Sequence, residues 1–157
     1  MIFVPGNVPS LKNSKQMAKT KDGKPVLLYS KTVKKYLQNL GIQLLSSKDG
    51  IVEYKTRPNV FKTKINGFFD NPVYPEVIGF NFIRDSMRKF DFHNAVQILA
   101  DLIVAHGFLR DDDMNSFIPV PMMINGSFYS VCKNNPGVYI KRIKHNINEL
   151  SFDIDDF

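Results

Sequence analysis

The stretch that decides the fold is residues 88–113, which read RKFDFHNAVQILADLIVAHGFLRDDD. From Asn94 onward, apolar residues recur at helical spacing, so this segment predicts an amphipathic helix. Gly107 predicts the left-handed residue that ends the helix, and Phe108 is expected to fold back onto the last turn. The buried stripe of this predicted helix consists of Leu99, Leu102, Ile103 and His106.

Polar and acidic residues flank the predicted helix on both sides. Asp91 and His93 precede it at alternate positions, and residues two apart on extended chain point to the same side. Consecutive carboxylates follow it at 111–113. Because carboxylate oxygens are the ligands that hard divalent cations prefer, a helix between two acidic turns predicts a metal site. The alternative is that these aspartates only cap the helix and shape its turns.

The polar side of the same helix also has an ordered pattern. Asn94, Gln97 and Asp101 fall at i, i+3 and i+7, which places them on a single face. A polar face of this kind is typical of a helix that borders a cleft.

This arrangement resembles the RusA family of Holliday junction resolvases. The family signature is Asp-x-Asp-Asn-x-x-Lys, a helix that carries an Asp, and then Gly-hydrophobic-x-x-Asp-Asp. Arg88 and Lys89 match the basic residues that precede the first Asp of the family. The positions that match the signature without a gap are Asp91, Asn94, Asp101, Gly107, Asp111 and Asp112.

Two positions depart from the family pattern. His93 stands where the family has its second Asp, which exchanges an anionic oxygen ligand for an imidazole. Gln97 stands where the family has a Lys, which removes a cation that would face phosphate. The close resemblance covers residues 88–112, and the rest of the chain agrees only in length and general pattern.

The resemblance implies a metal-dependent endodeoxyribonuclease that cuts Holliday junctions or other branched DNA in recombination and repair, of phage or prophage type. The implied metal ligands are Asp91, His93 and Asp112. The implied ion is Mg²⁺, with Mn²⁺ as an alternative because imidazole suits softer ions. Asn94, Asp101 and Asp111 would orient ligands or waters around the ion.

The resemblance also implies DNA contacts and a homodimer, since a four-way junction has two symmetric cleavage positions. The residues expected to contact DNA are Lys12, Asn13, Lys15, Arg88, Lys89 and Gln97. An ordinary basic loop is the alternative for residues 12–15. A protein that binds branched DNA without cutting it, or a structural protein of a mobile element, are the alternatives for the whole chain.

Charge is distributed unevenly along the chain. Residues 1–89 contain 16 Lys and Arg against 6 Asp and Glu, whereas residues 90–157 contain 5 against 9. A basic half beside an acidic cluster is what a metal-dependent nuclease requires, because cations hold the phosphate backbone while carboxylates gather the metal. The alternative is that the lysines only solvate the surface.

Composition predicts a folded chain in a reducing compartment. The hydrophobic share of 43% is large enough for a real core, and 157 residues suit one domain. Cys132 is the single cysteine, which excludes a disulfide framework, suits the cytoplasm and predicts a small buried hydrophobe. No run reaches the length of a membrane span and the N-terminus lacks a signal-peptide form, so no membrane contact is expected.

The rest of the chain predicts an α+β domain with a mixed or largely antiparallel sheet and two main helices packed on one face, RusA-like in outline. A helix capped by Ser30 is expected over 31–47, and 60–65 is either a short helix or a strand. Pro119 and Pro121 place the strand at 116–124 at an edge or in a bulge. Strands are expected at 1–5, 26–29, 77–84, 116–124, 128–131 and 138–143, with a type I′ turn at 125–126.

The predicted domain covers residues 1–147, and residues 148–157 form an acidic tail that ends in Phe157. We expect this tail to be a flexible, solvating end. The alternative is that it contacts a basic pocket on a partner or the basic groove of its own domain.

Overall fold

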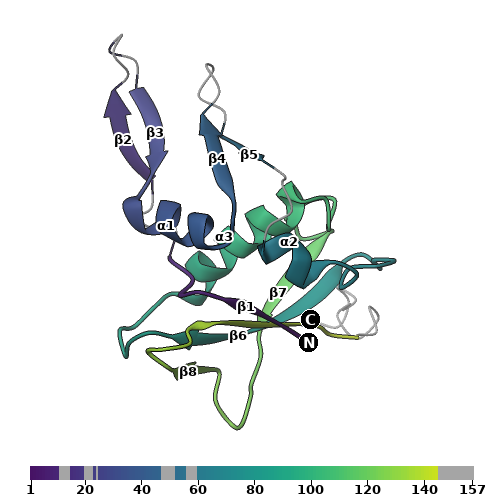
Figure 1. Cartoon of the computed structure of the whole chain (residues 1–157). Helices are drawn as coiled ribbons and strands as arrows, with labels where there is room; N and C mark the ends of the chain where they lie inside the picture. The colour runs from purple at the N-terminus through teal and green to yellow at the C-terminus, as the bar shows by residue number, and fades with distance from the viewer. Residues whose placement is uncertain (11–14, 20–22, 24, 47–51, 56–59, 145–157) are drawn as a thin grey trace, which may run out of the picture.

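The fold is α+β, built on a mixed five-stranded sheet (Figure 1). A computed structural model of the chain describes residues 1–10, 15–19, 23, 25–46, 52–55 and 60–144. The strands run in the order β1-β9-β6-β7, and β8 also pairs with β6. Their bounds are Ile2–Pro5 for β1, Glu76–Arg84 for β6, Phe117–Pro121 for β7, Tyr129–Val131 for β8 and Gly137–Arg142 for β9.

Strand β6 is the centre of this sheet, as its long apolar run predicts. It pairs antiparallel with β9 on one side and parallel with both β7 and β8 on the other. Residues 76–82 are all buried because the strand has neighbours on both edges and helices on one face. Phe80 and Phe82 point into the core that the helices cover, where Phe82 contacts the ring of Phe92.

In the part of the chain that the structure describes, three helices cover one face of the sheet (Figure 1). They are α1 (Lys31–Asn39), α2 (Val60–Ile65) and α3 (Phe92–Ala105). Helix α2 resolves the ambiguity that the sequence leaves at 60–65. Helix α3 contributes seven buried residues to the core, among them Leu99, Leu102 and Ile103 as predicted. Its predicted polar face holds too, since Gln97 is exposed and Asn94 and Asp101 are partly exposed.

Helix α3 ends as the sequence predicts and begins earlier. Gly107 has a φ of 72°, its N–H donates to the carbonyl of Val104, and the N–H of Phe108 donates to that of Ile103. These two bonds are the pattern that a glycine in the left-handed region allows. The helix begins at Phe92 and not at Asn94, so residue 93 is helical and not extended.

The predicted helix at 31–47 is too long. Helix α1 ends at Asn39, and Gly41, with a φ of 73°, reverses the chain there. Residues 43–46 form strand β4, which pairs with β5 (Val52–Lys55). The glycine ends the helix locally, and the pairing with β5 then overrides the helical spacing of the leucines that follow.

A second two-stranded ribbon is formed by β2 (Lys15–Lys19) and β3 (Pro25–Tyr29). The sequence predicts the strand at 26–29 but not β2. Both ribbons rise from the helical layer on the side away from the sheet (Figure 1). Tyr29 ends β3 opposite Lys15, and Ser30 then caps α1 through a bond from the N–H of Val33.

Strands β7 and β8 lie one after the other along a single edge of β6. The edge position of Pro119 and Pro121 is confirmed, as is the tight turn, where Asn125 and Gly126 both have positive φ. The strand after that turn pairs with β6 and not with the strand before it. The side-chain amide of Asn81 donates to the backbone carbonyls of Met122 and Ser127. These bonds give partners to two carbonyl groups in the segment between β7 and β8, where the pairing with β6 is interrupted.

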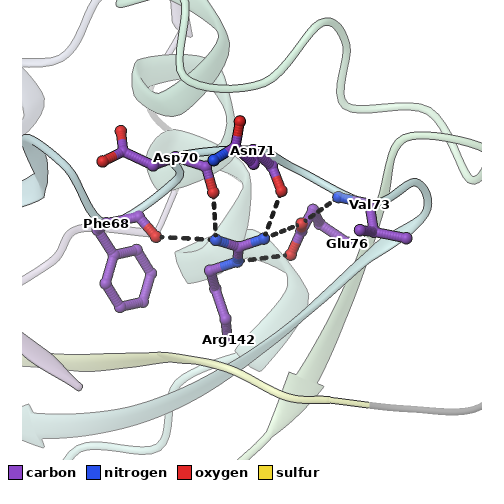
Figure 2. A network of polar contacts seen from close by, with 6 residues as sticks. All are labelled: Phe68, Asp70, Asn71, Val73, Glu76 and Arg142. Atoms are coloured by element: carbon purple, nitrogen blue, oxygen red, sulfur yellow. Dashed lines mark hydrogen bonds and ion pairs between the residues drawn. The ribbon is translucent and has the colours of Figure 1, made fainter.

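The loop before β6 is held by a polar network (Figure 2). The carboxylate of Glu76 accepts two bonds from the guanidinium of Arg142 and one from the N–H of Val73. The remaining donors of the arginine reach the backbone carbonyls of Phe68, Asp70 and Asn71. This network connects β9 to the loop and uses every N–H direction of the arginine.

Cys132 is exposed, so the prediction of a buried cysteine is wrong. It directly follows the short strand β8, which lies at the edge of the sheet among the described strands. Among the residues described, no helix is long and apolar enough to cross a membrane. The predicted acidic tail at 148–157 and its boundary lie outside the described residues.

Candidate functional site

Asp91 lies at the start of α3 as its N-cap. Its backbone is extended, and its Oδ1 accepts hydrogen bonds from the N–H groups of His93 at 3.0 Å and Asn94 at 3.4 Å. A carboxylate at this position also interacts favourably with the helix dipole. Two of the N–H groups that the start of a helix offers to a phosphate are therefore already bonded to Asp91.

His93 lies beside Asp91 but faces solvent. Its Nδ1 is 4.0 Å from Oδ1 of Asp91, and its side chain is 87% exposed against 49% for the aspartate. The imidazole edge packs against the ring of Phe92. The two side chains that the sequence places together at the start of the helix thus lie together on the surface.

The acidic turn after α3 has a defined scaffold. The Nε–H of Arg110 donates to the hydroxyl of buried Ser116 at 2.8 Å, and its guanidinium lies 4.3 Å from the centre of the Tyr74 ring. Within the turn, Oδ1 of Asp111 accepts from the N–H of Asp112 at 2.8 Å. Arg110 therefore closes the loop, and Asp111 orients the backbone at Asp112.

A pocket of about 300 Å³ lies beside the C-terminal half of α3. It is lined by Tyr29, Asp101, Val104, Ala105 and Asp112. The pocket therefore brings together one carboxylate from the predicted polar face of the helix and one from the acidic turn. Tyr29, at the end of the basic β2–β3 ribbon, forms part of the same wall.

Asp91 and Asp112 lie toward opposite ends of α3. Asp101, which shares the pocket with Asp112, is ten residues beyond Asp91, or about 15 Å along the helix axis. Among the residues that the structure describes, no group of three or more His, Cys, Asp and Glu side chains is arranged to hold a metal ion. A single ion held by Asp91, His93 and Asp112 stays a prediction.

The basic residues expected at DNA divide into two groups. Arg88 and Lys89 are exposed on the segment that leads from β6 to Asp91. Lys12 and Asn13 lie outside the described residues, and for Lys15 the structure describes only the backbone pairing in β2. Gln97 is exposed on α3, one turn beyond His93.

Arg84 was not singled out by the sequence analysis. In the structure it connects the N-terminal segment at Val8 with Phe90, which precedes α3. Its guanidinium donates to the carbonyl of Val8 and lies 4.8 Å from the centre of the Phe90 ring. Burial lowers the pKa of Arg84, an effect opposed by the nearby charge of Asp85. The sequence signal that could have identified Arg84 is its position as a lone arginine at the end of an apolar strand, because a cation there needs a specific partner.

Comparison with protein-family models, with characterised proteins and with solved structures finds no match for this chain. Its function is therefore inferred from its residues and their geometry.

Proposed function

We propose that this protein is a metal-dependent endodeoxyribonuclease that hydrolyses phosphodiesters in Holliday junctions or other branched DNA. The observation that carries the proposal is the pocket in which Asp101 and Asp112 line one cavity beside Tyr29. The resemblance of residues 88–112 to the RusA family supports the same class of enzyme.

The residues of the pocket fit a hard divalent ion. Mg²⁺ is usually held by one or two carboxylates, while waters and substrate phosphate oxygens complete its coordination. Asp101 and Asp112 supply such a pair of carboxylates in an accessible cavity. Once bound, the ion would supply Lewis acidity toward the phosphoryl group and a more acidic water.

The chain itself would hold and orient the reacting groups. Asp111 fixes the backbone at Asp112 and so keeps that carboxylate at the pocket, while Arg110 restrains the whole turn. Asn94 would orient water or phosphate near the start of α3. A single ion shared with Asp91 and His93 would require a second protomer or a rearranged acidic turn, because α3 separates them from Asp112.

Contacts to DNA are assigned to the residues that the sequence predicts for this role. We propose that Arg88 and Lys89 bind the phosphate backbone next to Asp91, together with Lys12, Asn13 and Lys15 from the N-terminal segment. Such contacts position the backbone and do not read bases. A homodimer would present two pockets to the two symmetric strands of a junction.

Cleavage of a labelled synthetic four-way junction, with Mg²⁺ or Mn²⁺, tests this proposal. We expect Asp112→Asn and Asp101→Asn each to reduce the cleavage rate by at least about 100-fold, because each removes an anionic ligand. Asp113→Asn, which removes an equal charge from the same turn, is the matched control and should cut like the wild type. Undiminished cleavage by Asp112→Asn would exclude the proposed site.

Two observations favour a second candidate, a branched-DNA-binding protein without nuclease activity. The described residues contain no metal-binding group of three side chains, and His93 replaces a carboxylate of the family pattern. This alternative predicts tight binding of the junction without metal and no cutting with either ion. Asp112→Asn separates the two candidates, since it removes a carboxylate of the pocket and would abolish cutting by a nuclease, but would leave binding by the alternative nearly unchanged.

The acidic tail is proposed to contact a basic surface on a partner or on its own domain. Removal of residues 149–157 should then raise DNA affinity if the tail covers the DNA-binding surface. An unchanged affinity and an unchanged dependence on salt would exclude that covering role.

A further inference from the structure

Strand β8 exposes apolar side chains at an edge of the sheet that the described strands form. Tyr129 is 41% exposed and Val131 is 39% exposed. They stand opposite Phe82 and Arg84 of β6 in a parallel register, which places all four on the sheet face that carries the helices. Neither Tyr129 nor Val131 belongs to the core cluster of the described residues, so core packing does not explain these two exposed apolar side chains.

The ring of Tyr129 is supported from behind by a chain of aromatic contacts. Its centre lies 5.5 Å from that of Phe90 at 81°, and Phe90 lies 5.4 Å from buried Phe82. The guanidinium of Arg84 covers Phe90 at 4.8 Å. We name Phe90, Tyr129 and Val131 the aromatic ledge, a surface that offers one exposed ring on a fixed base.

The surroundings of the aromatic ledge are mainly basic. Arg84 contacts it directly, while exposed Arg88, Lys89 and Lys133 lie within a few residues of Phe90 or Val131 along the chain. Two carboxylates, Asp85 and Asp91, oppose these four cations. A ring that is free to stack, beside an excess of positive charge, complements a nucleic-acid strand whose bases are unpaired.

We propose that the aromatic ledge binds an unpaired nucleobase at the branch point of the DNA, through stacking on Tyr129. The inference rests on the proposed function, because it takes DNA as the substrate. It adds a physical reason why the protein would bind branched DNA more tightly than a continuous duplex. Phe90 directly precedes Asp91, so the ledge adjoins the start of α3. A continuous duplex keeps its bases stacked inside and offers nothing to the ledge.

Fluorescence anisotropy in EDTA tests this inference without cleavage. The probes are a labelled four-way junction and a labelled continuous duplex of equal length, at one fixed salt concentration. We expect Tyr129→Ala to weaken junction binding about tenfold and duplex binding less than about twofold, in line with base–aromatic stacking. Tyr129→Phe should bind both like the wild type, because it keeps the ring.

A matched control and a second readout complete the test. Val73→Ala shortens another exposed apolar side chain, 72% exposed on the far loop, and should not change binding. With 2-aminopurine at the branch point, the wild type should change the probe fluorescence and Tyr129→Ala should not. Equal losses on junction and duplex, no loss at all, or no binding of the junction by the wild type would overturn the inference.

The other occupant to be tested at the ledge is a second copy of the chain. Sedimentation of the wild type and of Tyr129→Ala distinguishes a protein interface from a DNA-binding surface. If Tyr129→Ala converts a wild-type dimer to a monomer, the ledge is a protein interface and the inference fails. Failure here leaves the nuclease proposal standing, since that depends on cleavage by Asp112→Asn. Conversely, undiminished cleavage by Asp112→Asn would leave the stacking result intact.

Discussion

Two acid–base side-chain pairs of this molecule have opposite environments. Glu76 and Arg142 form a bidentate pair whose side chains are only 6% and 29% exposed (Figure 2). Asp91 and His93 approach only to 4.0 Å, with side chains 49% and 87% exposed. The first pair has all its donors satisfied by the protein, whereas the second pair faces water.

The difference separates a role in stability from a role in binding. A buried charge without its partner is costly, so the Glu76–Arg142 network must remain complete for the loop before β6 to hold. An exposed pair contributes little to stability, because water screens it. Only the exposed residues are accessible to a ligand from solution.

The largest effect is expected at the buried pair. Glu76→Ala should lower the free energy of unfolding by about 3–5 kcal/mol, because it leaves the Arg142 guanidinium half-buried without its carboxylate. Urea unfolding followed by circular dichroism measures this loss. Asp70→Ala, an exposed carboxylate of the same loop, is the control, and a loss below about 1 kcal/mol for Glu76→Ala would remove the contrast between the two pairs.

Arg110 should have an intermediate effect, since it is exposed but bonds a buried group. Arg110→Ala leaves the hydroxyl of buried Ser116 without its donor and should cost about 1–3 kcal/mol. It should also weaken metal binding at Asp112, which calorimetric titration with Mn²⁺ measures. Loss of stability with unchanged metal affinity would show that Arg110 acts on folding alone.

Asp91 allows its structural and functional roles to be separated. Asp91→Ala removes the N-cap of α3 and should cost about 1 kcal/mol, whereas Asp91→Asn keeps a capping oxygen and should cost much less. If Asp91 shares the metal ion through a second protomer, both variants should also lose junction cleavage, because both lose the charge. Thermal unfolding and the cleavage assay together check this, and equal stability losses would mean that the charge and not the cap is what stabilises the helix.

His106 should make stability depend on pH. Burial lowers its pKa below the usual 6.5; the bond from Nδ1–H to the Leu102 carbonyl opposes this shift, and the charge of Lys62 adds to it. The unfolded chain therefore binds the proton more readily, so this contribution is complete above pH 6.5 and is lost as pH falls through the lower folded pKa. His106→Gln should show a smaller loss of unfolding free energy from pH 7.5 to pH 5 than the wild type, and an equal loss would exclude this linkage.

The smallest change in stability is expected at His93. His93→Ala should change the free energy of unfolding by less than about 0.5 kcal/mol, because its imidazole is almost fully exposed. If the imidazole binds metal, the same variant should reduce cleavage with Mn²⁺ more than cleavage with Mg²⁺. A large loss of stability in His93→Ala would contradict the contrast between the buried Glu76–Arg142 pair and the exposed Asp91–His93 pair.

Much of the fold around α3 could be predicted, because the relevant signals are local. Gly107 ends the helix through its own φ, and Asn125 with Gly126 forms a tight turn for the same reason. The end of α1 was also signalled, by Gly41, but the leucines after it kept a helical spacing that pairing with β5 overrode. Local pattern could not reveal a partner strand that lies further along the chain.

The sequence predicted which residue types form the candidate site better than it predicted which of those residues lie together. The sequence determined that carboxylates would stand before, within and after one helix, since spacing along a helix is fixed by its geometry. Only the tertiary structure decided that Asp101 and Asp112 share a pocket with Tyr29, that Arg84 joins Val8 to Phe90, and that Tyr129 stands at an edge of the sheet that the described strands form. These contacts join residues far apart in the chain, and such contacts depend on how the helix and strands pack together, which no local propensity encodes.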